Sequence, residues 1–258
     1  RYLTLRCVPG AESIVAGVYR VQPGHVLEYK DGHISETRIA TFDLQPHEQP
    51  RESAASTLRD LLAASLDRET PESVLWSAGI DCAALAALRD ELKPVYVSLD
   101  RTWQDESRLA AESARMMGLS LQTLHARRLT EETVHKAVRA LDEPLADPSI
   151  LPFWLIAEAA SEKATTYVSG HGADELLGGY PRFNFLQKAR GAKDLVPAGL
   201  LTDMMPALPP NAFIRRGSRY LVSMHDAQES YLSLVSVFDR GERETMYTDA
   251  MKSAIYDL

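Results

Sequence analysis

The sequence predicts an α/β protein with a doubly wound parallel sheet, a small β-rich segment before it and a helical part after it. Between residues 51 and 169, short apolar runs alternate with helix-like segments, as in parallel sheets whose connections are helices. Two of these runs, 73–76 and 165–169, stop at small, polar turns that contain glycine. Ligands bind at such strand ends in open α/β sheets, so the two turns are the first candidates for a site.

Residues 1–50 are expected to form strands and loops. Short β-prone runs occur at 2–5, 18–21, 26–29 and 34–42. The last two flank Asp31-Gly32, and an Asp-Gly pair between two β-prone runs predicts a hairpin.

The alternating region supplies the elements of the predicted sheet. Helices are expected at 51–68, 83–92, 105–117, 130–141 and 153–160, and strands at 73–76, 95–99, 119–124 and 165–169. Leu58, Leu62 and Leu66 fall on one face of the first helix. Thr130 suits an N-cap because two glutamates follow it in the first turn. Beyond Pro181, the sequence predicts only helices, at 211–225, 227–238 and 242–247.

Composition excludes several classes of function. The 258 residues are 45% apolar with a formal net charge of −8, and no basic block offers a surface for nucleic acid or anionic lipid. Cys7 and Cys82 are the two cysteines, too few for a disulfide framework or a thiolate metal site. No apolar run approaches the roughly 20 residues that cross a bilayer. We expect a cytoplasmic protein with small-molecule partners and without nucleic-acid or membrane partners.

Each of the two turns ends in a carboxylate, Asp81 in one and Asp174 in the other. Two carboxylates at one crevice, beside backbone N–H groups at helix starts, suit a polyphosphate bound to Mg²⁺.

The common motifs of other enzyme classes do not fit this sequence at their required spacing. The sequence has no Gly-Lys-Ser/Thr, no Gly-x-Ser-x-Gly and no His-Glu-x-x-His, and Glu175 stands where a dinucleotide fingerprint needs its third glycine. Nucleotide chemistry is therefore the leading hypothesis.

Four segments resemble one enzyme family. Ser77-Ala78-Gly79-Ile80-Asp81-Cys82 resembles the Ser-Gly-Gly-x-Asp-Ser pyrophosphate loop of N-type ATP pyrophosphatases. Residues 169–180, Ser-Gly-His-Gly-Ala-Asp-Glu-Leu-Leu-Gly-Gly-Tyr, resemble the Ser-Gly-Glu-Gly-Ala-Asp-Glu-Leu-Phe-Gly-Gly-Tyr signature of asparagine synthetases. Residues 142–149 are similar to a segment of bacterial members, and residues 2–29 to the end of the glutaminase domain. Because the matches follow in order over nearly the whole chain, the sequence is identified as a member of the glutamine-hydrolysing asparagine synthetase family.

The resemblance implies two domains and a reaction. Residues 1–50 would be the tail of a glutaminase-type domain. Residues 51–258 would be an ATP-pyrophosphatase synthetase domain, adenine nucleotide alpha hydrolase-like and incomplete at its C-terminus. The family makes asparagine by adenylating a carboxylate, here expected to be aspartate, for attack by ammonia from glutamine. ATP and Mg²⁺ are the implied cofactors. The sequence leaves the oligomeric state open, with a homodimer as one alternative.

The resemblance also implies the site residues. The ATP-binding positions would be Trp76, Ser77, Gly79, Asp81, Cys82, Val97, Ser169 and Gly170. Asp81 and Asp174 would be the metal ligands.

His171 stands where asparagine synthetases carry a glutamate and the related β-lactam synthetases a tyrosine that acts in amine deprotonation. An imidazole titrates near neutral pH and can serve as a base or a phosphate contact, so we predict a catalytic role for it. The alternative is a turn histidine that only faces solvent. The same replacement keeps a β-lactam-type synthetase or a peptide cyclase open as alternative functions.

Two replacements and two missing motifs set this chain apart from the family pattern. Ala78 replaces a glycine, and Cys82 replaces a serine, which exchanges a good hydroxyl donor for a weak thiol donor. The family's later lysine motif and its N-terminal nucleophilic cysteine fall outside residues 1–258, and Arg1 in place of methionine indicates a fragment. We therefore expect the chain by itself to be inactive. A degenerate nucleotide-binding module is a third alternative.

Overall fold

The computed structural model describes residues 2–41, 48–99, 106–184, 231–232, 235–238 and 245–256. The chain divides into two compact units. The first consists of residues 1–40, 143–146 and 178–258, and the second of residues 41–142 and 147–177. Among the helices of the described ranges, none is both long enough and apolar enough to cross a membrane.

A four-stranded parallel sheet forms the centre of the second unit. Its strands are β3 (Ser73–Leu75), β4 (Lys93–Ser98), β5 (Gln122–His125) and β6 (Tyr167–Val168), in the spatial order β5-β4-β3-β6. The chain builds outward from β3 to β5 and then returns to place β6 on the free side of β3. This reversal makes the carboxyl ends of β3 and β6 a topological switch point, the place where ligands bind in open α/β sheets.

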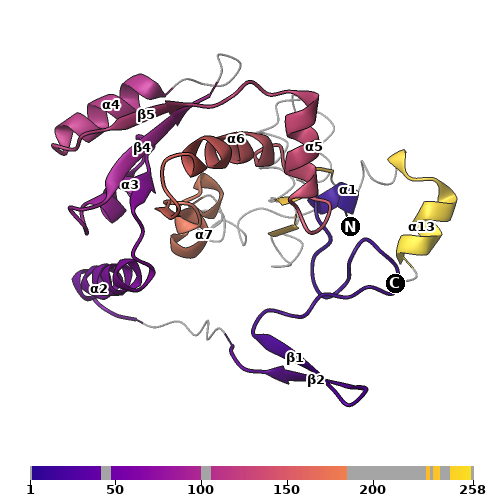
Figure 1. The fold of residues 1–258 in the computed structure, drawn as a ribbon. Helices are drawn as coiled ribbons and strands as arrows, with labels where there is room; N and C mark the ends of the chain where they lie inside the picture. Colours follow the sequence, from indigo (N-terminus) through magenta and orange to yellow (C-terminus); the bar gives the residue numbers. More distant parts are fainter. Residues whose placement is uncertain are drawn as a thin grey trace, which may run out of the picture. The chain divides into compact units, whose positions relative to one another are not determined.

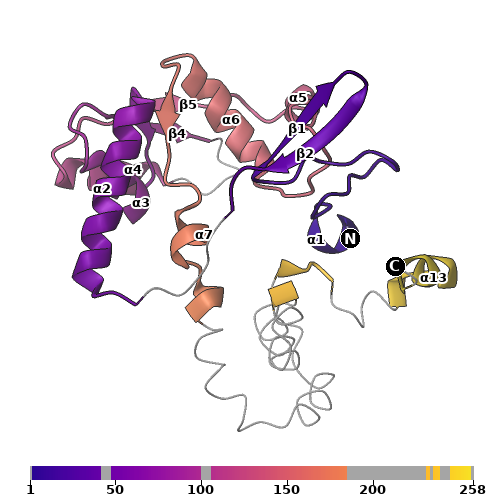
Figure 2. The same cartoon turned by 90° about the horizontal axis from the view of Figure 1, so that it is seen from below.

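Helices cover both faces of this sheet (Figures 1 and 2). The helices of this unit are α2 (Arg51–Glu69), α3 (Ile80–Ala86), α4 (Ser107–Met116), α5 (Glu131–Arg139), α6 (Ile150–Ser161) and α7 (Ala173–Leu177). Val74 and Tyr96 pack in a core with buried residues of α2, α3 and α4. Val95 and Val97 belong to a second core with Ala160 of α6. The alternation along the strands thus places two helical layers on opposite faces, and the predicted doubly wound α/β fold is confirmed.

Local signals in the sequence explain where several elements begin and end. Thr130 caps α5, because its Oγ1 accepts the N–H of Thr133 at 3.2 Å. Gly118 follows the end of α4 with a φ of +69°, a conformation that glycine adopts readily. The N–H of Ser149 donates to Oδ1 of Asp147 at 2.9 Å just before α6 begins.

Several core elements differ from the prediction in their bounds. Helix α6 begins at Ile150 instead of 153, and β6 is limited to Tyr167–Val168 instead of 165–169. The helix expected at 83–92 is α3, which begins at Ile80 and ends at Ala86. Because the polar turn runs directly into this helix, Asp81 and Cys82 lie in its first turn instead of before it. The strand expected at 119–124 is β5, which begins only at Gln122, while Leu119 and Leu121 pack against the core without joining the ladder.

The first unit contains α1 (Tyr2–Leu5), the hairpin of β1 (His25–Lys30) and β2 (His33–Arg38), and α13 (Asp249–Tyr256). The hairpin is confirmed, with φ values of +52° and +79° at Asp31 and Gly32, as a type I′ turn requires. The prediction of a β-prone start is wrong, because residues 2–5 close a single helical turn.

The C-terminal predictions are only partly covered by the structure. The predicted helix 211–225 lies outside the described residues, as do half of 227–238 and half of 242–247. Of the described residues in these ranges, Tyr231, Leu232, Val235, Thr245 and Met246 are helical. The predicted helices are wrong at 236–238 and at Tyr247, which are described and are not helical. Helix α13 was not predicted.

A carboxylate near the base of the sheet gives a prediction on stability. Thr165 donates to Oε1 of Glu72 from its hydroxyl at 2.6 Å and from its N–H at 3.3 Å, which joins the start of β3 to the segment before β6. These hydrogen bonds, that of the hydroxyl first, lower the pKa of Glu72 below its ordinary value of 4.5. Such a carboxylate stabilises the fold above that ordinary value, and its contribution is lost as the pH falls through the folded-state pKa.

We therefore expect the free energy of unfolding of Glu72→Gln to depend less on pH, in the acid range, than that of the wild-type protein. Urea unfolding at a series of pH values from about 6 to about 3 should give a smaller fall in the free energy of unfolding than in wild type. Glu52→Gln, an exposed change in α2, is the matched control. An unaltered acid limb in Glu72→Gln would contradict the role of these hydrogen bonds.

Candidate functional site

The turns after β3 and β6 are built in the same way. Oγ of Ser77 accepts the N–H of Gly79 at 3.2 Å, and Oγ of Ser169 accepts the N–H of His171 at 3.3 Å. A serine that bonds the amide two residues further on closes a compact turn at the end of a strand. Each turn then leads into a helix, α3 in one case and α7 in the other.

The two turns touch each other at Gly170. A Cβ atom on this residue would lie 2.5 Å from Cβ of Asp81 and 3.1 Å from the backbone nitrogen of Cys82. Only a glycine permits so close an approach. The structure therefore brings together three of the predicted site residues, Asp81, Cys82 and Gly170, at the switch point.

Cys82 closes the first turn from inside. Its side chain is only 3% exposed, and its Sγ accepts the N–H of Ser77 at 3.3 Å. The same sulfur lies 3.0 Å from the carbonyl oxygen of Ser77 and 3.1 Å from that of Gly79. The thiol is thus engaged within its own turn.

Asp81 and Asp174 hold equivalent places in the two helices that follow the turns. Asp81 lies in the first turn of α3 and Asp174 in the first turn of α7, and both are half-buried. Gly172, with a φ of +93°, makes the bend from which α7 starts. Carboxylates in the first turn of a helix lie beside its unpaired N–H groups, which suits a site that also binds phosphate oxygens.

Metal binding at these carboxylates would depend on the substrate. Within the part of the chain that the structure describes, no group of three or more His, Cys, Asp or Glu side chains gathers to hold a metal ion. Mg²⁺ is commonly held by one or two carboxylates together with phosphate oxygens and water. Asp81 and Asp174 fit that pattern, and their sharing of one ion stays a prediction.

Trp76 and Val97 place their side chains in the two cores, away from the turns. Nε1 of Trp76 donates to the carbonyl oxygen of Ala110 at 3.0 Å and to Oγ of Ser113 at 3.1 Å, both on α4. Val97 is buried in the core that α6 covers. Their backbones lie at the ends of β3 and β4, so a contact with adenosine from either residue would come from main-chain atoms.

His171 is exposed on the second turn, and its ring meets that of Phe153. The ring centroids lie 5.5 Å apart and the planes are inclined at 38°. Phe153 was not among the predicted site residues. The signal that could have revealed it is its position at the start of an apolar helix, since the start of α6 and the end of β6 reach the same edge of a parallel sheet.

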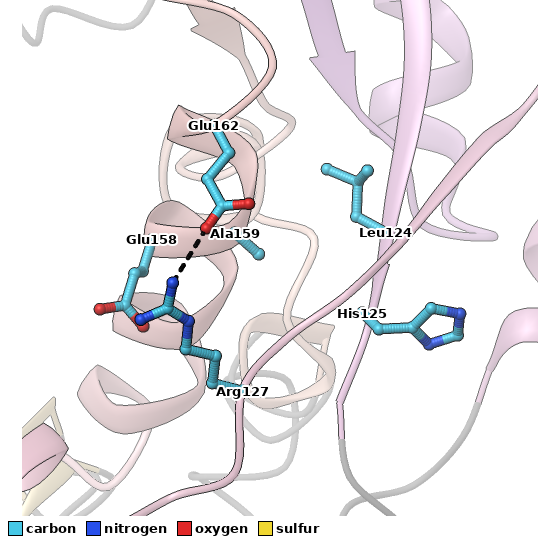
Figure 3. A pocket seen from close by; sticks show the side chains of 6 residues that line it. All are labelled: Leu124, His125, Arg127, Glu158, Ala159 and Glu162. Atoms are coloured by element: carbon cyan, nitrogen blue, oxygen red, sulfur yellow. Dashed lines mark hydrogen bonds and ion pairs between the residues drawn. The ribbon is translucent and has the colours of Figure 1, made fainter.

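A separate hollow of about 250 Å³ lies between the end of β5 and α6 (Figure 3). Its lining consists of Leu124, His125, Arg127, Glu158, Ala159 and Glu162. Nη2 of Arg127 pairs with Oε1 of Glu162 at 3.3 Å, while His125 points away from α6 (Figure 3). Both partners of this pair are well exposed, and such pairs contribute about 0–1 kcal/mol. None of the predicted site residues lines the hollow.

Comparison with known proteins relates the chain to one family. Residues 53–254 match the family described as asparagine synthase. The asparagine synthetase [glutamine-hydrolyzing] 1 of Bacillus subtilis (strain 168) is 24% identical over 265 residues, which cover 95% of this chain and 40% of that protein. A putative asparagine synthetase [glutamine-hydrolyzing] of Mycobacterium tuberculosis (strain CDC 1551 / Oshkosh) is 26% identical over 193 residues, with coverages of 69% and 30%. The chain therefore spans less than half the length of these relatives.

Two solved structures are also similar to the chain. One is a glutamine-dependent NAD⁺ synthetase from Acinetobacter baumannii in complex with ADP, with a TM-score of 0.36 and 15% identity over 83% of this chain and 47% of that one. The other is an NH₃-dependent NAD synthetase from Campylobacter jejuni, with a TM-score of 0.34 and 12% identity over 82% of this chain and 97% of that one.

Proposed function

We propose that the chain, which belongs to the asparagine synthase family, is the ATP-binding synthetase part of an amide-forming ligase. The observation that carries this proposal is the contact of the two signature turns at the switch point, where Gly170 lies against Asp81. In this proposal the chain activates a carboxylate with ATP, and ammonia then displaces AMP to give the amide.

The chemistry is two displacements. A carboxylate oxygen of the substrate attacks the α-phosphorus of ATP, the bond to the bridging oxygen breaks, and pyrophosphate leaves. The nitrogen of ammonia then attacks the acyl carbon, loses a proton, and AMP leaves with the electrons of the acyl–oxygen bond. Negative charge builds on phosphate oxygens in the first step, so catalysis there is mainly positioning and electrostatic stabilisation.

The first turn supplies the donors for the departing pyrophosphate. The N–H groups in the first turn of α3, which follow Gly79, and the Ser77 hydroxyl would bind its oxygens, while the N–H of Gly79 is bonded to Ser77. The Ser77 hydroxyl accepts the N–H of Gly79 and lies 3.4 Å from Sγ of Cys82, and it carries one proton that could be donated to a phosphate oxygen. Ser169 and Gly170, with the main chain of Trp76 and Val97, would form the adenosine side.

Asp81 and Asp174 would hold Mg²⁺ against the triphosphate. When bound, the ion supplies positive charge that offsets the charge developing on the phosphate oxygens. The half-burial of both carboxylates strengthens their attraction for a cation relative to a fully solvated position.

Aspartate is the proposed carboxylate and glutamine the proposed source of ammonia, in a cytoplasmic enzyme. Residues 1–50 are assigned to the tail of a glutaminase-type domain and residues 51–258 to the synthetase domain. The relatives' printed names support glutamine hydrolysis in the whole protein. His171, in place of the family's glutamate, favours one alternative, a synthetase for another carboxylate such as a β-lactam-type synthetase or a peptide cyclase.

ATP–pyrophosphate exchange in the full-length protein tests this assignment. We expect exchange that depends on aspartate and exceeds that with glutamate, a β-amino acid or a peptide carboxylate. Exchange with one of the other carboxylates alone would replace aspartate and favour the alternative synthetase. ATP binding in calorimetry without exchange for any carboxylate would contradict a ligase and indicate a degenerate nucleotide-binding module.

His171→Ala should separate the two displacements. An imidazole that accepts the proton of the attacking amine acts only in the second step, and loss of such a base lowers a rate by about 10²-fold to 10⁴-fold. We therefore expect amide formation to fall by about 10²-fold or more while exchange stays within about threefold of wild type. His135→Ala, an exposed histidine of α5, is the matched control. Amide formation at the wild-type rate would make His171 a turn residue.

A further inference from the structure

We infer that Phe153 is a positioning residue that holds the imidazole of His171 in place for the amide-forming step. The inference rests on the proposed function for its role in the reaction, but the pairing of the two rings stands on geometry alone.

The two rings are arranged as attractive aromatic pairs are. Their centroids are 5.5 Å apart and their planes are inclined at 38°. Aromatic pairs attract when tilted or offset with centroids roughly 4.5–7 Å apart, because the edge of one ring then meets the face of the other. The contact joins the second turn to α6 across 18 positions of the sequence, 171 minus 153.

His171 needs an outside contact to hold its side chain. It stands between Gly170 and Gly172 on an exposed turn, and Gly172 has a φ of +93°. The N–H bond to Ser169 orders the backbone, but it leaves both side-chain torsions of the histidine free. An exposed imidazole with no packing partner samples several rotamers, and a second ring packed against one of its faces removes most of them.

Phe153 can serve as that packing partner because its own backbone is held in place by α6. Its N–H donates to the carbonyl oxygen of Ser149 at 3.1 Å in the first turns of α6. Two residues further on, Leu155 is 1% exposed in the core, and Ile156 packs against the sheet. The helix is therefore held firmly on the sheet while it presents Phe153 at the edge where β6 ends.

Phe153 lies at the rim of the core. It is 49% exposed, so about half of its surface is free to meet the turn that carries His171. A base must lie within hydrogen-bond reach of the proton that it accepts, and a misplacement of about 1 Å can lower a rate by about 10²-fold. The ring of Phe153, in contact with that of His171, can therefore hold the imidazole in the orientation that the reaction needs.

The pairing is tested first without reference to activity. In protein labelled with ¹³C at histidine, the ring current of Phe153 should displace the His171 resonance, which His171→Gln identifies by its disappearance. We expect Phe153→Leu to move this resonance and Phe153→Tyr, which keeps the ring, to leave it. The resonances of His125 and His135 report that the unit is still folded. A His171 resonance unaffected by Phe153→Leu would overturn the pairing.

The role in the reaction is tested in the full-length protein by measuring the two displacements separately. We expect Phe153→Leu to lower amide formation by about tenfold, to leave ATP–pyrophosphate exchange and the KM for ATP within about twofold, and to be rescued by Phe153→Tyr. In a His171→Ala background, Phe153→Leu should have no further effect, because the residue acts through the imidazole. An equal fall in both displacements, or a fall that persists without the imidazole, would overturn the positioning role. Wild-type protein without exchange for any carboxylate would instead contradict the proposed function, and the resonance test would still decide the pairing.

Discussion

Replacing Asp81 or Asp174 with asparagine should abolish Mg²⁺-dependent ATP–pyrophosphate exchange in the full-length protein. Asparagine keeps the size of the side chain and one of its oxygens but removes the charge that would hold the ion. Removal of a single group that stabilises developing charge lowers a rate by about 10²-fold to 10³-fold. Since both carboxylates are proposed to share one ion, we expect each single replacement to show a loss of at least this size.

The control must separate the metal site from general damage. Asp90→Asn changes an exposed carboxylate in the connection from α3 to β4 and should leave exchange intact. Both site variants lie in the first turn of a helix, where asparagine is tolerated, so urea unfolding should stay close to wild type. Raising the Mg²⁺ concentration should restore part of the exchange if the ion is held less tightly. Near-normal exchange in both variants would remove the metal assignment.

The parallel sheet and its two turns could be predicted because local signals agree with the final packing. The strands of the core are apolar runs, the connections carry apolar faces at helical spacing, and Thr130 and Gly118 mark helix ends in the expected way. Serine and glycine directly after Leu75-Trp76 and after Val168 leave few structures other than tight turns. Strand ends of a parallel sheet meet at one edge, so the meeting of the two turns followed from the fold class.

What could not be predicted depends on contacts between distant segments. A buried strand alternates between two faces, but the sequence does not say which face a given residue takes. Trp76 therefore could not be placed against α4 in advance. Helix α3 begins at Ile80 and its first turn lies against Gly170, whereas local helix preference favoured a later start at Ala83. Residues 2–5 are too short a run for periodicity to distinguish a helical turn from a strand.

Phe153 is the clearest case of a residue that local sequence hides. Within its helix it is one apolar residue among many, since 150–160 reads Ile-Leu-Pro-Phe-Trp-Leu-Ile-Ala-Glu-Ala-Ala. Only the return of the chain after β6 brings His171 to it. Its exposure, which distinguishes it from the buried Leu155, is a property of the assembled unit.

Gly170→Ala should separate the two signature turns and so disable the site. The added Cβ would lie 2.5 Å from Cβ of Asp81, 3.1 Å from the nitrogen of Cys82 and 3.2 Å from the carbonyl carbon of Asp81. None of these atoms is the end of a flexible side chain, so the turns themselves must move. Overpacking of this kind costs about 1–3 kcal/mol in the free energy of unfolding. Because Asp81 moves with its turn, we also expect exchange to fall by about 10²-fold.

Gly118→Ala is the control that makes this test specific. Gly118 has a φ of +69° and nothing within 4 Å of the place that a Cβ would take, so alanine there brings backbone strain without a clash. Strain in the left-handed region costs about 1–2 kcal/mol, similar to the loss expected at Gly170. Two variants of comparable stability should therefore differ in exchange, with Gly118→Ala close to wild type and Gly170→Ala lower by about 10²-fold. Wild-type exchange in Gly170→Ala would mean that the close contact of the two turns is not needed for nucleotide chemistry, and the proposed site would lose its main support.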